Sequence, residues 1–140
     1  MTGARLHFVL PYALPVLNRA LREHWSRRHK RLKGLAWEVR ALTHGRRPPA
    51  PWPRARVTIT RYGLKRPDHD GLVGGCKSLL DVLVTPGPVR MVKGCPQQRH
   101  PYGLAVIQDD NPSACELIAT SVQVSSRQEL RTEVLVEEIR

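Results

Sequence analysis

The chain has 140 residues and a net charge of +11, with 23 Lys and Arg against 12 Asp and Glu. This length allows one ordinary domain with a buried core and is too short for two, so we predict a single domain over residues 1–140. No stretch approaches the ~20 consecutive apolar residues of a membrane-spanning helix, and three irregularly spaced cysteines without an apolar leader favour a cytoplasmic protein over a secreted, disulfide-stabilised one.

The charge is distributed unevenly along the chain. Residues 1–67 contain 16 basic and 2 acidic residues, a balance of +14, whereas residues 68–140 contain 7 basic and 10 acidic residues, a balance of −3. A basic half beside a cluster of carboxylates predicts a polyanionic partner such as DNA, with arginines on the phosphates and a metal between the reacting phosphate and the acids. The alternative is a basic surface that only confers solubility.

The first elements are a strand and a long helix. Residues 5–10 predict a short strand that ends at Pro11. Over residues 18–43 the apolar positions recur at threes and fours, which predicts an amphipathic helix with Asn18 as its N-cap. Basic side chains form a band on the outer side of this helix, and one more precedes the acidic stretch. The predicted DNA-binding residues are Arg19, Arg22, Arg27, Arg28, Lys30, Arg31, Lys33 and Arg66.

The rest of the chain predicts an α/β (α+β) fold. Residues 54–62 alternate as a central strand, 72–84 have helical periodicity, and 85–102 form a long surface loop. A short strand is expected over 103–108, and alternation in 116–124 and 130–139 predicts a C-terminal β-hairpin. We therefore expect a mixed sheet of about four to five strands, with two helices on one face and the acidic side chains at one edge.

All five aspartates lie between Asp68 and Asp110. Asp68 and Asp70 are two positions apart, so in an extended backbone their side chains leave from the same face, roughly 6.5 to 7 Å apart at Cα. Such a pair can converge on one hard cation, which favours Mg²⁺ with Mn²⁺ as a substitute. A metal held by carboxylates activates water and stabilises a leaving oxygen, as phosphodiester hydrolysis requires.

Several motifs occur in the order of a known nuclease family. They are Asp68-His69-Asp70-Gly71, then Lys77 followed by Asp81-Val82-Leu83, then Asp109-Asp110, with Pro15-Val16-Leu17-Asn18-Arg19 at the first helix. This order resembles the RusA family of crossover junction endodeoxyribonucleases, which resolve Holliday junctions. The chain departs from the family by Gly71 in place of asparagine, a longer spacer before Lys77, and the insertion at 85–102.

The resemblance implies a metal-dependent endonuclease for branched DNA, most simply Holliday junctions. By position, Asp68, Asp70 and Asp110 would be the metal ligands, and Lys77 would lie near the scissile phosphate. Resolving a four-way junction takes two symmetric cuts, so the resemblance also implies a homodimer.

Structural roles could explain the same residues. Asp70 could be the N-cap of the second helix, and residues 109–112 could form an ordinary turn. Lys77 and Asp81 could be an i,i+4 pair. For Asp81 we expect this structural role and no function.

Two other functional classes compete with a junction nuclease. Pro67-Asp68 resembles the start of the P-D…(D/E)-x-K site of restriction-type nucleases, but Met91 and Val92 precede Lys93, so the second acid is missing. The other competitor is a basic DNA-binding protein without catalytic activity, of phage or prophage origin. Nicking of branched DNA in the presence of magnesium distinguishes an enzyme from such a protein.

Overall fold

The structure, a computed structural model, describes residues 3–16 and 25–139. Its main sheet has the order β1-β6-β2-β5 and consists of β1 (Arg5–Leu10), β2 (Ala55–Gly63), β5 (Cys115–Gln123) and β6 (Arg131–Glu138). Strands β2 and β5 are parallel, and the other neighbours are antiparallel. The predicted mixed sheet is confirmed, and β2 is a central strand.

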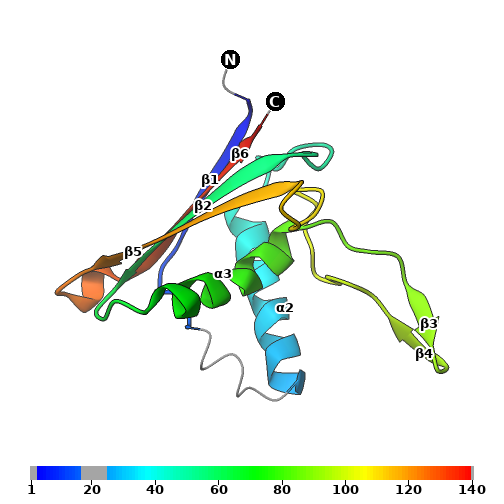
Figure 1. Ribbon diagram of the computed structural model, residues 1–140, viewed down its shortest axis with the longest axis horizontal. Helices are drawn as coiled ribbons and strands as arrows, with labels where there is room; N and C mark the ends of the chain where they lie inside the picture. Colours follow the sequence, from blue (N-terminus) through cyan, green and yellow to red (C-terminus); the bar gives the residue numbers. More distant parts are fainter. Residues whose placement is uncertain (1–2, 17–24, 140) are drawn as a thin grey trace.

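Two helices cover one face of this sheet, as predicted. Helices α2 (Trp25–Leu42) and α3 (His69–Leu83) lie on the same side of the strands (Figure 1). The alternating residues of each strand give this side a buried apolar surface, with Phe8 and Val57 as examples, and the helices pack Val39 and Leu79 against it. The result is a single two-layer α+β domain. Within the described residues, no helix is long and apolar enough to cross a membrane.

The start of α3 differs from the prediction. The helix begins at His69, and Asp68 is its N-cap, because the Asp68 Oδ1 atom accepts a hydrogen bond of 2.8 Å from the Gly71 N–H. Further along, a Cβ on Gly75 would lie 2.3 Å from the Pro15 carbonyl oxygen. A glycine is therefore required where the loop after β1 packs on the helix.

The predicted C-terminal hairpin is wrong. Both strands form, but β2 lies between them: β5 pairs with β2 in parallel, and β6 pairs with β1 and β2. The connection at 124–130, which includes the 3₁₀ turn Arg127–Glu129, passes across one end of β2. Alternation identifies the buried face of a strand and leaves its neighbour open, so the same pattern fits both arrangements.

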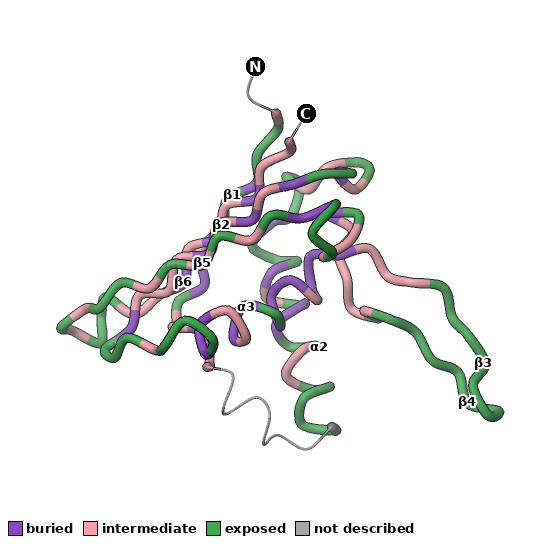
Figure 2. The backbone as a smooth tube through the Cα atoms, viewed as in Figure 1, coloured by how far each residue is buried: buried purple, intermediate pink, exposed green. Residues whose placement is uncertain are grey.

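The segment predicted as an irregular loop contains a second, small sheet. Strands β3 (Arg90–Val92) and β4 (Cys95–Gln97) pair as a hairpin that projects from the domain and is exposed along its length (Figure 2). The turn residues Lys93 and Gly94 have φ angles of 50° and 79°, the conformation that tight hairpin turns require. We call residues 88–99 the arm.

Candidate metal centre

Three side chains from separate segments meet at the C-terminal end of α3. Asp81 comes from the last turns of the helix, His100 directly follows the arm, and Asp110 comes from the turn before β5. One ligand atom of each lies within 4.8 Å of the others. We call Asp81, His100 and Asp110 the acidic cluster.

Backbone hydrogen bonds at the end of α3 bring Asp110 to Asp81. The Leu104 N–H donates to the Val82 carbonyl at 2.8 Å, and the Val106 N–H donates to the Leu83 carbonyl at 2.9 Å. These carbonyls have no partner within the helix, and residues 104–107 satisfy them. The predicted strand at 103–108 thus makes only isolated bridges, through Ile107, and its role is to hold the next turn against the helix.

The two acids of that turn have different environments. The Asp109 carboxylate accepts the Asp110 N–H at 2.7 Å and the Asn111 side-chain amide at 2.9 Å. The hydrogen bond from the Asp110 backbone is the main reason that the pKa of Asp109 lies below its usual value. Asp109 therefore stabilises the turn, and Asp110 belongs to the acidic cluster.

Asp81 is an acid whose charge is only partly compensated. Partial burial raises the pKa of Asp81, and the nearby Asp110 carboxylate acts in the same direction, while His100 and Arg28 oppose both effects. The closest atoms of these opposing groups are His100 Nδ1 at 3.4 Å and Arg28 Nη2 at 3.7 Å from the carboxylate oxygens. Both contacts are long, so a bound cation would further stabilise the two carboxylates.

His100 also has an unused polar atom. Its Nδ1 faces Asp81, and its Nε2 is buried without a hydrogen-bond partner among the described residues. A buried polar group without a partner is costly, whereas Nδ1, on the side of Asp81, is the nitrogen that an ion in the cluster would meet. Two carboxylates with this imidazole are a donor set that fits a divalent cation.

The donor types favour Mn²⁺ over Mg²⁺ among the ions expected from the sequence. Carboxylates suit both ions, whereas imidazole suits transition metals. A Mg²⁺ ion holds its ligands at ~2.0–2.1 Å, so opposite ligands are about 4.2 Å apart. The three ligand atoms of the cluster all lie within 4.8 Å of one another, so they would have to draw closer to hold such an ion.

The structure divides the predicted metal ligands. Asp110 is in the acidic cluster, but Asp68 and Asp70 lie at the opposite end of α3. Asp70 precedes Asp81 by eleven helical residues, which corresponds to roughly 16 Å. The extended geometry expected for Asp68 and Asp70 is wrong because the helix begins between them, and the acids do not share one edge of the sheet.

The other predicted residues near the cluster are Lys77 and Arg28. Lys77 is exposed one helical turn before Asp81 and contributes to its electrostatic environment. That Asp81 has only a structural role stays a prediction, and Asp81 is at the same time a member of the cluster. Sequence reasoning missed His100 as well, because nothing in the spacing relates it to Asp81.

The basic band is only partly available to a ligand. Arg27, Arg28, Lys30 and Lys33 are exposed on α2. Arg31 instead donates a hydrogen bond of 3.0 Å to the Ser78 hydroxyl and joins the two helices. Arg66 is exposed just before the cap of α3. Arg19 and Arg22, like the predicted Asn18 cap, fall outside the described residues.

We compared the chain with models of known protein families, with curated proteins and with solved structures, and none of the three comparisons found a match.

Proposed function

We propose that this protein is a divalent-cation-dependent endonuclease that hydrolyses phosphodiester bonds in branched DNA, most simply four-way junctions. The observation that carries the proposal is the partly buried acidic cluster beside an exposed basic helix. The order of motifs along the chain, which resembles the RusA family, supports a junction as the substrate.

Each residue near the cluster has a role in this proposal. Asp81 and Asp110 would hold the ion, with His100 as a third ligand. The ion would supply an activated water and charge stabilisation at the leaving oxygen. Arg28 and Lys77 flank Asp81 with positive charge, and they would hold the non-bridging oxygens of the scissile phosphate.

The DNA would follow α2. Arg27, Lys30 and Lys33 continue the positive charge of Arg28 along the exposed side of the helix. The arm carries Arg90, Lys93 and Arg99, and residues 82–108 contain no acid, so its charge also favours a polyanion. A four-way junction has two equivalent strands to cut, so the proposal includes a homodimer with one cluster per protomer.

A cleavage panel tests the proposal. Labelled four-way junction, flap and linear duplex are incubated with the protein in Mg²⁺, in Mn²⁺ or in EDTA. We expect nicks in the junction with either metal, more with Mn²⁺, and none in EDTA. Absence of nicks in every substrate, with junction binding intact, would exclude the nuclease.

That negative outcome would favour the second candidate, a DNA-binding protein without catalytic activity. The observation on its side is that Asp81 already contacts two neighbouring side chains, Arg28 and His100. Such contacts can fix α2, α3 and the end of the arm to one another without any metal.

A further inference from the structure

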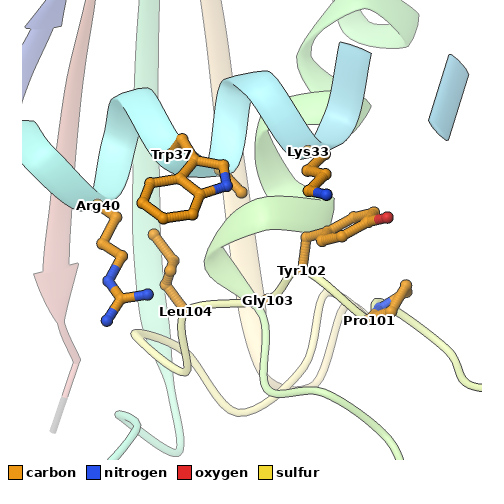
Figure 3. Close-up of a pocket in the computed structure, with 8 residues that line it drawn as sticks. Lys33, Trp37, Arg40, Pro101, Tyr102, Gly103 and Leu104 are labelled. Carbon is orange, nitrogen blue, oxygen red and sulfur yellow. The ribbon is translucent and has the colours of Figure 1, made fainter. Parts of the chain in front are cut away.

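A second recess lies beside the acidic cluster, between α2 and the chain that follows the arm. It is a cavity of about 230 Å³ (Figure 3). Helix α2 provides one wall and residues 101–104 provide the other. The lining residues are Lys33, Ala36, Trp37, Arg40, Pro101, Tyr102, Gly103 and Leu104. This volume is below the range of whole small-molecule sites, which indicates space for one flat group.

Trp37 is the unusual member of this lining. Its side chain is 63% exposed, although its helix neighbours Ala36 and Val39 are in the core. Figure 3 shows the indole directed toward the side of the recess that carries Leu104, with Arg40 beside it. The Arg40 guanidinium carbon lies over the indole ring, 5.8 Å from its centre, and the exposure of the side chain leaves the rest of the aromatic surface open to a ligand.

The charge of the recess indicates which class of ligand it can bind. Lys33 and Arg40 are two helical turns apart on the same side of α2, and none of the lining residues is acidic. Aromatic sites for ammonium groups would be disfavoured by these two cations. A flat ring that carries negative charge on both sides is favoured instead, and an unpaired nucleotide within a DNA strand has these properties.

The recess lies next to the acidic cluster. A neighbouring cavity of about 260 Å³ is lined by Arg28, Asp81 and His100, and it shares Pro101 and Tyr102 with the recess. The Tyr102 ring is fixed between them by His29, with which it makes an edge-to-face contact at 4.9 Å and a hydrogen bond through its hydroxyl. Arg28 and Trp37 are ~13 Å apart along α2, a distance that a few nucleotides of one strand cover.

We propose that the recess binds one unstacked nucleobase of the DNA strand whose phosphate lies at the acidic cluster. Trp37 stacks on the base, and Lys33 and Arg40 hold the phosphates on either side. This inference rests on the proposed function, and it explains selectivity for branches. A regular duplex must be unstacked before a base can enter, whereas a branch or an extrahelical nucleotide provides the base at a lower cost.

The test compares two short duplexes in EDTA that differ at one position. One contains a single extrahelical thymidine, and the other contains an abasic residue at the same place. The native protein should bind the first about 10-fold more tightly, the scale of one base stacked on an aromatic ring. Trp37→Leu should abolish the difference, and Trp37→Phe should retain most of it. Leu64→Ala, which removes an exposed apolar side chain, should leave the difference unchanged.

Tryptophan fluorescence provides a second readout that needs no destabilising change. The extrahelical duplex should quench the native protein more than the abasic duplex does, and Trp37→Phe should lack this extra quenching. Equal affinity of the native protein for both duplexes, or an unchanged preference in Trp37→Leu, would overturn the inference even if the protein cleaves junctions. Conversely, a base preference that depends on Trp37 in a protein that never cleaves DNA would support the recess and refute the nuclease.

Discussion

Replacing Asp81 by asparagine should abolish cleavage while the fold survives. The substitution removes one of the two carboxylates of the acidic cluster, so we expect junction cleavage in Mn²⁺ or Mg²⁺ to fall by at least ~100-fold, the scale of one lost catalytic group. The structural cost is small, because the contacts of Asp81 with Arg28 and His100 are 3.7 Å and 3.4 Å long. The Arg28 side chain is 57% exposed, and an ion pair with so exposed a partner contributes about 1 kcal/mol or less.

Asp70→Asn is the matched control on the same helix. It removes the same charge, but from the first turn of α3. An acid in this position stabilises a helix by about 0.3–1 kcal/mol through the helix dipole. Both variants should therefore show similar melting temperatures, and both should bind a junction in EDTA at least as tightly as the native protein. Cleavage should separate them, since Asp70→Asn should remain active and Asp81→Asn and Asp110→Asn should not.

The opposite pattern would refute the assignment of the metal to the acidic cluster. If Asp70→Asn and Asp110→Asn were inactive while Asp81→Asn cleaved normally, the ligands expected from the family resemblance would be correct. These two acids lie near opposite ends of α3 in one protomer, so a second copy would have to bring them together. Mixing the two inactive variants would then restore cleavage, because a mixed dimer has one site with both native acids.

Three further predictions follow from individual contacts. Arg27→Gln should reduce the salt dependence of junction binding by about one phosphate contact, as measured by titrations at several salt concentrations. Cys95 should react rapidly with a thiol reagent at neutral pH and Cys76 should not, because Cys95 is exposed and burial raises the pKa of Cys76 to about 12. The Tyr62 hydroxyl, 2.7 Å from Glu133, lowers the pKa of this acid. The hydrogen bond therefore stabilises the folded protein above a pH of about 4.3, and this stabilisation is lost as the pH falls further. Melting temperatures of Tyr62→Phe should consequently depend less on acid pH than those of the native protein.

The elements of the fold could be predicted because their patterns report burial directly. Residues 5–10 and 54–62 alternate since one face of each strand packs against helices, and the structure places β1 and β2 there within a residue. The pairing of β5 and β6 could not be predicted in the same way. Both strands bury one face against the same core, and a connection of seven residues is long enough either to close a hairpin or to pass a strand.

The candidate site could be predicted only in part, for a related reason. Asp110 was recognisable as part of an acidic turn, but its partners depend on which end of α3 this turn contacts. Residues 104–107 form hydrogen bonds with the last carbonyls of α3, which places the acidic turn at the C-terminal end of the helix. Asp110 therefore lies next to Asp81 and not next to Asp70. Those backbone contacts leave no signature in the side chains of the segment.

His100 was missed because the intervening segment was expected to be irregular. A loop of that length leaves the position of its far end open, whereas a hairpin returns the chain to its starting point. The Gly87 N–H donates to the Arg99 carbonyl at 2.9 Å, which closes the base of the arm next to the end of α3. His100 and Tyr102 follow directly. Residues 100–102 therefore provide both a member of the acidic cluster and the side chain that lies between the cluster and the Trp37 recess.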